Sequence, residues 1–157
     1  WINYDGFIHI VESNPKVQFI IAGKPYRTEK WTALSQFPNV QLIGFLPPSD
    51  VPKFLQEVDL TLNLYQRIPG LDVNSMKIYE SLACHTPVAS LEYHKDLRAD
   101  FSGLVKTFSN PSELGQSLQL VASLGNDSGW RKLVDKFIEN STWDNRVSQT
   151  LKALPYG

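Results

Sequence analysis

Three charged side chains, Asp72, Lys77 and Glu80, lie where a loop is expected to become a helix. Asn74 and Ser75 favour the start of that helix, because both residue types cap helix N-termini well. Lys77 would lie in the first turn and share a face with Glu80. A lysine there opposes the helix macrodipole, at a cost of about 0.3–1 kcal/mol at an exposed site. The pattern therefore predicts either an anion bound by Lys77 and the free backbone N–H groups, or a local Lys77–Glu80 ion pair worth at most roughly 0.5 kcal/mol.

Two apolar segments flank this helix and would position its start. Residues 60–64 are short and apolar enough for a buried strand. The helical pattern ends near Cys84, and Thr86-Pro87 breaks it before the apolar segment 88–91. Together these segments predict a β-loop-α-β unit whose strand-to-helix loop carries the charges.

The same alternation of strands and helices continues along the chain. It predicts an α/β fold with one doubly wound parallel sheet and helices on both faces. No repeat or long linker divides the chain, so residues 1–157 are expected to form a single domain. The expected strands are 17–22, 40–44, 60–64, 88–91 and 103–108, and the expected helices outside the central unit are 4–12, 29–36, 50–58, 112–124, 128–139 and 143–154.

Composition excludes several classes of protein. The net charge of −1 gives no general attraction to nucleic acid or to an anionic membrane surface. No run approaches 18 apolar residues, so no transmembrane helix is expected. Cys84 is the single cysteine, which excludes an intrachain disulfide framework and a cysteine-based zinc site and favours an inert core thiol in a reducing compartment. A GxGxxG fingerprint, a P-loop and an Asp-x-Asp pair are all missing, so neither a dehydrogenase nor an NTPase is supported.

Three segments together resemble a known family. They are Asp72-x7-Glu80 followed by LACHTPVAS, the earlier NPKVQFIIAG, and NVQLIGFLPPSDVPKFLQEVDLTLNLY between them. Their order and spacing resemble the C-terminal half of GT-B fold glycosyltransferases of the group-1, or family 4, type, whose hallmark is Glu-x7-Glu at a helix start. The resemblance covers roughly residues 14–154.

The resemblance implies a Rossmann-like donor-binding domain that takes part in transfer of a hexose from a nucleoside-diphosphate sugar to a hydroxyl acceptor, in glycan or glycolipid synthesis. It implies no cofactor or metal, and it implies a location in the cytoplasm or at the inner face of the membrane. Acceptor binding would belong to an N-terminal domain that this chain lacks, so the isolated chain is expected to be inactive. The family's domain also opens with one more strand, upstream of Trp1. The alternative is a non-catalytic GT-B-like domain that serves as a protein-interaction partner.

The expected ligand lies at the carboxyl ends of the strands, where the loops of a doubly wound sheet converge. The turn after residues 40–44 would offer an apolar slot for the base, Glu80 would accept the ribose hydroxyls, and the helix start with Lys77 would hold the phosphates. The resemblance implies the same assignments, and it places Asp72 near the donor sugar as the catalytic residue. The expected nucleotide-binding residues are Gly44, Phe45, Leu46, Arg67, Asn74, Ser75, Lys77 and Glu80.

Three positions depart from the family pattern. Asp72 is one methylene shorter than the family's first glutamate, and Asp5 stands where the family has a phosphate-binding lysine. These two departures keep the non-catalytic alternative open. His85 replaces the helix-ending glycine and is expected at the edge opposite the ligand, without a direct role. The basic residues that remain to bind phosphate are Lys77, Lys24, Arg27 and Arg67. Apart from Lys77, Arg67 is the best candidate, because it follows the central strand.

Overall fold

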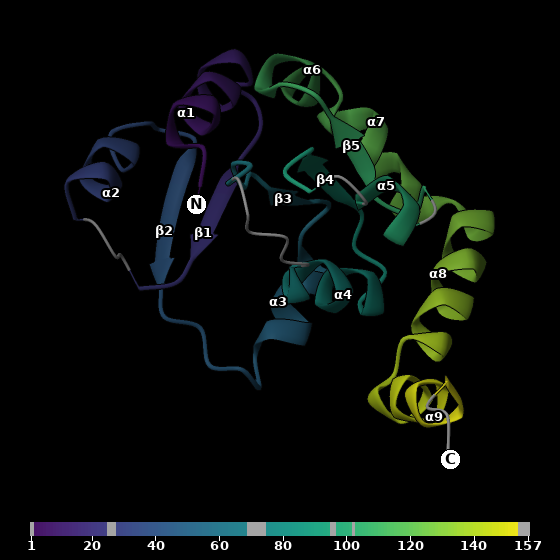
Figure 1. Cartoon of the computed structure of the whole chain (residues 1–157). Helices are drawn as coiled ribbons and strands as arrows, with labels where there is room; N and C mark the ends of the chain where they lie inside the picture. The colour runs from purple at the N-terminus through teal and green to yellow at the C-terminus, as the bar shows by residue number, and fades with distance from the viewer. Residues whose placement is uncertain (1, 25–27, 69–74, 95–96, 102, 154–157) are drawn as a thin grey trace.

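The computed structural model describes residues 2–24, 28–68, 75–94, 97–101 and 103–153. Short parallel strands alternate with helices along this part of the chain (Figure 1). The strands are β1 (Phe19–Ala22), β2 (Val40–Gly44), β3 (Thr61–Asn63), β4 (Val88–Leu91) and β5 (Lys106–Phe108). The helices are α1 (Tyr4–Ser13), α2 (Thr28–Leu34), α3 (Val51–Glu57), α4 (Met76–Ala83), α5 (Leu97–Asp100), α6 (Pro111–Gln116), α7 (Leu118–Ala122), the 3-10 helix η1 (Ser123–Asn126), α8 (Ser128–Asn140) and α9 (Trp143–Ala153).

Strand pairing confirms the predicted α/β class and corrects the predicted sheet. β1 pairs with β2, and β3, β4 and β5 pair in that order, all of them parallel. The expected single sheet is wrong for the described residues, since they contain no strand that bonds to both β1 and β3. Within the described ranges, β1 and β3 each pair with another strand along one side only. The further strand expected ahead of α1 stays a prediction.

Helices cover both faces of the central strand β4, so its side chains are buried on both sides. Ala89 and Leu91 pack into one core with α1, α6 and α7, while Val88 packs into a second core with α4 and α8. Figure 1 shows α1 and α6 above the strands and α3 and α4 below them. A strand with apolar side chains on both faces is typical of a parallel sheet.

A close approach of α1 and α6 explains a glycine inside the first helix. A Cβ added at Gly6 would lie 2.6 Å from Cγ of Pro111, the first residue of α6. Gly6 also donates its amide to Oδ1 of Asn3, the N-cap of α1, at 2.8 Å. The Pro111 ring of α6 can lie this close to α1 because Gly6 has no side chain.

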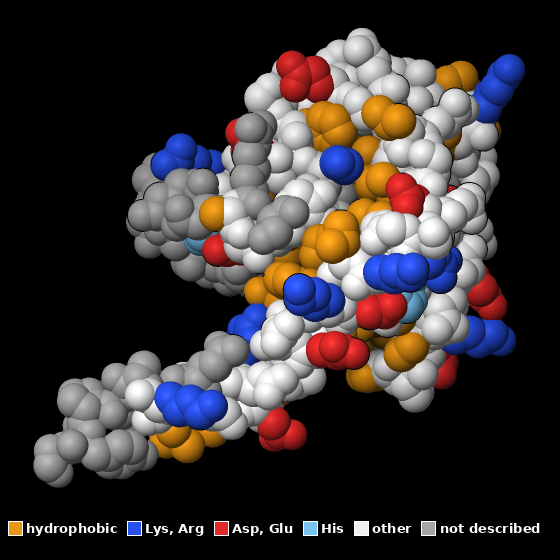
Figure 2. Space-filling model, turned by 90° about the vertical axis from the view of Figure 1, so that its right-hand side faces the viewer, with side chains coloured by type: hydrophobic (Ala, Val, Ile, Leu, Met, Phe, Trp, Pro, Cys, Tyr) orange, Lys and Arg blue, Asp and Glu red, His pale blue; other side chains and the backbone are white. Residues whose placement is uncertain are grey.

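The C-terminal helices differ from the expected ones in two ways. The single helix expected at 112–124 divides at Ser117 into α6 and α7, followed by η1. α8 begins as predicted, with Asp127 as the N-cap and the indole of Trp130 donating to the Leu104 carbonyl at 3.1 Å. α9 projects from the body as an arm (Figure 2), and its Trp143 is 72% exposed and so lies outside the core. None of the helices in the described ranges is long and apolar enough to cross a bilayer.

Candidate functional site

The start of α4 lies at the carboxyl edge of β3 and β4, as the predicted β-loop-α-β unit requires. Ser75 occupies the N-cap with an extended backbone, but its side chain makes no capping hydrogen bond. Its amide donates to the hydroxyl of Tyr93, in the loop after β4, at 3.2 Å. Met76 is 56% exposed and Lys77 is also exposed, so these two residues of the first turn face solvent, whereas Ser75 and Ile78 are buried.

Among the residues that the structure describes, Lys77 is held by an aromatic side chain and not by a carboxylate. Its Nζ donates to the hydroxyl of Tyr65 at 2.8 Å and lies 5.4 Å from the centroid of that ring. Tyr65 in turn packs edge-on against Tyr93, with 5.4 Å between centroids and 85° between planes. Lys77 and Glu80 form no ion pair within the described part of the chain. The local ion pair that the sequence left open is therefore not formed.

A series of buried hydrogen bonds between polar residues supports the contact of Tyr65 with Tyr93. Asn63 of β3 donates through Nδ2 to Oγ of Ser90 at 2.9 Å, and these two residues are register partners in the sheet. The Ser90 hydroxyl in turn donates to the Leu91 carbonyl at 2.9 Å. Burial raises the pKa of Tyr93, and hydrogen bonds from the Ser75 amide and from Asn63 offset part of that rise. Tyr93 thus stays neutral, and its hydroxyl connects the buried hydrogen bonds of Asn63 and Ser90 to the start of α4.

Sequence analysis missed Tyr65, Tyr93, Asn63 and Ser90. The sequence did contain a signal for these residues. A tyrosine comes shortly after each of the apolar segments 60–64 and 88–91, and a polar residue interrupts each segment. Which of these side chains meet depends on the pairing and register of β3 and β4, which a single sequence does not specify.

Glu80 is exposed and lies one turn after Lys77 on α4. Its charge also acts on Cys84, at the C-cap of the same helix. Burial is the larger cause of a raised pKa of the Cys84 thiol, and the charge of Glu80 adds to it. This agrees with the expectation of an unreactive thiol.

A second group of predicted residues lies after β1 and β2. Gly44 adopts a left-handed backbone, with φ of 71°, and its carbonyl accepts from the Gly23 amide at 2.7 Å. Phe45 follows with 62% of its surface exposed, and Lys24 lies over its ring at 5.3 Å from the centroid. Leu46 is half-buried. The turn thus offers an exposed aromatic face next to a cation, a pairing that sequence analysis did not predict.

The remaining predicted residues are placed as follows. Arg67 lies after β3 with an exposed side chain, and it has no hydrogen-bond partner among the described residues. Asp5 is in the first turn of α1. Asp72, Asn74 and Arg27 lie outside the described residues. The roles predicted for all of these residues stay predictions.

His85 closes α4 at the end of the sheet where β4 begins. It has a left-handed backbone, with φ of 56°, and donates its amide to the Leu82 carbonyl at 2.8 Å. Its Nε2 lies 2.7 Å from Oδ1 of Asp135 on α8. A left-handed residue that ends a helix is usually glycine, which explains why the family has glycine at this position.

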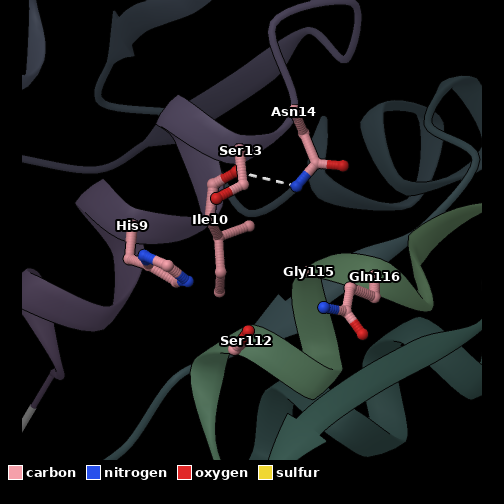
Figure 3. Close-up of a pocket in the computed structure, with 7 residues that line it drawn as sticks. All are labelled: His9, Ile10, Ser13, Asn14, Ser112, Gly115 and Gln116. Atoms are coloured by element: carbon pink, nitrogen blue, oxygen red, sulfur yellow. Dashed lines mark hydrogen bonds between the residues drawn. The ribbon is translucent and has the colours of Figure 1, made fainter.

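A pocket between α1 and α6 lies apart from the predicted residues (Figure 3). His9 and Ser13 of α1 line it on one side, and Ser112 and Gln116 of α6 line it on the other. It contains no carboxylate and none of the predicted site residues. The described residues also include no group of three or more His, Cys, Asp or Glu side chains arranged to hold a metal ion.

Comparison with known sequences identifies the family. The profile of the glycosyl transferase-like family matches residues 6–152, nearly the whole chain. The chain therefore belongs to the glycosyl transferase-like family. A comparison with curated proteins found no match.

Solved structures show the same fold at low sequence identity. Anabaena HepE in complex with UDP and glucose superimposes with a TM-score of 0.63 at 16% identity, over 96% of this chain and 46% of that one. WaaG, a glycosyltransferase involved in lipopolysaccharide biosynthesis, gives 0.59 at 18% identity, over 99% and 44%. The N-terminal domain of trehalose-6-phosphate phosphatase from Candida albicans gives 0.67 at 13% identity, over 95% and 37%. The chain thus has the Rossmann-like α/β architecture of GT-B glycosyltransferases and spans less than half the length of each of these proteins.

Proposed function

We propose that this chain is the donor-binding domain of a glycosyltransferase that moves a hexose from a nucleoside-diphosphate sugar to a hydroxyl acceptor. The observation that carries the proposal is the start of α4. There an exposed lysine is held at the carboxyl edge of the sheet without a carboxylate partner among the described residues, and an exposed glutamate follows one turn later. Membership of the glycosyl transferase-like family and the fold shared with a UDP-bound HepE support it.

Each part of the donor has a matching group in this proposal. Lys77 supplies charge-assisted hydrogen bonds to the diphosphate, because an ammonium keeps donors free after one bond to Tyr65. Glu80 accepts the two ribose hydroxyls, since an ionised carboxylate is an acceptor only. Phe45 offers its exposed face to the base, and Asp72 serves at the sugar. The acceptor site, the N-terminal domain that contains it, and a cytoplasmic or inner-membrane location belong to the proposal for the whole protein.

The test measures nucleotide affinity and fold stability of the same variants. Isothermal titration with UDP, GDP and UDP-glucose is compared between the unmutated chain and Glu80→Gln. The variant should bind about tenfold more weakly, because a charge-assisted hydrogen bond is worth about 1.5–3 kcal/mol. Urea unfolding should change by no more than about 0.5 kcal/mol, since Glu80 is exposed and has no ion pair in the described part of the chain.

Glu139→Gln is the matched control, because it removes an exposed glutamate from another helix, α8. It should leave both affinity and stability unchanged. If no nucleotide binds the unmutated chain at millimolar concentration, or if Glu80→Gln binds like the unmutated chain, the donor-site proposal is wrong. If that unchanged affinity comes with a loss of stability, Glu80 has a structural role.

A further inference from the structure

The hydroxyl of Tyr65 has one partner among the described residues, and that partner is a donor. Lys77 donates to it at 2.8 Å. An ammonium has no acceptor, so the proton of the Tyr65 hydroxyl is not used in this contact. No described residue accepts that proton in a hydrogen bond. With respect to the described residues, the phenol therefore presents an O–H without an acceptor at an exposed place, next to the remaining N–H groups of Lys77.

The position of this hydroxyl is set by its surroundings. The ring of Tyr65 packs edge-on against Tyr93, whose own hydroxyl is bonded to the Ser75 amide. The backbone of Tyr65 forms an isolated antiparallel bridge with Ile2. Ring and backbone are thus both held, so the hydroxyl and Lys77 form a pair of donors whose positions are set before any ligand binds. A preorganised site loses less conformational entropy on binding than a flexible one.

We infer that Tyr65 is a further anion-binding residue of the donor site: its hydroxyl accepts from Lys77 and donates to an oxygen of the diphosphate. The ligand class is an oxyanion with several acceptor oxygens, because the groups left for a ligand are the remaining N–H donors of the Lys77 ammonium and the proton of the Tyr65 hydroxyl. This inference rests on the proposed function, and it adds a neutral donor beside the cation that the sequence pattern indicated. The competing explanation is that Tyr65 serves only to pack its ring against Tyr93.

Tyr65→Phe separates the two explanations, because it removes the hydroxyl and keeps the ring. Three probes are titrated: UDP, inorganic pyrophosphate and uridine. The variant should bind UDP and pyrophosphate about tenfold more weakly, since a hydrogen bond to a charged group is lost. Uridine carries no phosphate, so its affinity should not change. Urea unfolding is measured beside the titrations, to show that the variant is folded.

Tyr79→Phe is the matched control. Tyr79 lies on α4, two residues after Lys77, and its ring packs against Phe101 while its hydroxyl has no hydrogen-bond partner among the described residues. This variant should bind all three probes like the unmutated chain. An equal loss in both tyrosine variants would overturn the inference.

The outcomes also separate this inference from the proposed function. If UDP binds but Tyr65→Phe has no effect, or weakens uridine equally, the inference is wrong and the donor site stands. If pyrophosphate binds in a Tyr65-dependent way but no nucleotide binds, the inference stands and the proposed function fails. If the unmutated chain binds neither UDP nor pyrophosphate, both are overturned.

Discussion

Tyr93→Phe tests the connection between the fold and the start of α4. Tyr93 is 6% exposed, and its hydroxyl accepts the Ser75 amide at 3.2 Å and contacts Asn63. The substitution keeps the ring and its edge-on contact with Tyr65, so packing should change little. The buried Ser75 amide loses its partner, which costs about 1–3 kcal/mol. We therefore expect the free energy of unfolding at neutral pH to fall by about that amount.

The pH dependence of this loss has a definite sign. Burial raises the pKa of Tyr93 in the folded chain above its ordinary value of 10.0. Below that value both the folded and the unfolded chain hold the proton, so the stabilisation by Tyr93 is complete. As the pH rises through about 10, the unfolded chain releases the proton first, which favours unfolding. The unmutated chain should lose this stabilisation in alkali and Tyr93→Phe should not, so the stability difference between them narrows.

Urea unfolding at a series of pH values, followed by circular dichroism, measures that difference. Comparing the two proteins cancels the other tyrosines, which titrate in both. A difference that stays constant or widens from about pH 8 to about pH 11 would refute the reasoning. A difference below about 0.5 kcal/mol at neutral pH would show that the Ser75 amide has another partner.

Three further predictions concern other parts of the structure. Gly6→Ala should lower the free energy of unfolding measured in urea. Overpacking against Pro111 costs about 1–3 kcal/mol, and the higher helix propensity of alanine offsets about 1 kcal/mol of that cost. His85→Gly should be about 1 kcal/mol more stable than His85→Ala, since both lose the ring and only glycine relieves the left-handed backbone. Alkylation of Cys84 by iodoacetamide should be faster in Glu80→Gln, because burial and the Glu80 charge both raise the thiol pKa and the variant removes the second cause.

Each of these has a contradicting result. A more stable Gly6→Ala would show that α6 shifts to make room for the added methyl group. Equal stability of the two His85 variants would show that the turn after α4 has no strain to release. An unchanged rate for Cys84 in Glu80→Gln would leave burial as the only cause of the raised thiol pKa.

The parallel α/β class and the place of α4 could be predicted from the sequence because both depend on local patterns. Short apolar runs alternate with helical periodicity, and such alternation permits few architectures. Lys77 and Glu80 are near one another in the sequence, so their shared helix face also follows from local geometry. The resemblance to glycosyltransferases rested on the same local segments, and the family match over residues 6–152 agrees with it.

Only the tertiary structure decided which distant side chains meet at that helix. Tyr65, Tyr93 and Lys77 come from a strand end, a loop and a helix, and the register of β3 and β4 brings them together. The division of the described strands into two hydrogen-bonded sheets likewise depends on which strands are neighbours, and no local pattern encodes this. Side chains contact across a sheet according to strand order and register, and these are set by the packing of the whole domain. For that reason the sequence determined the cation of the candidate site, whereas the tertiary structure determined the tyrosine that holds it.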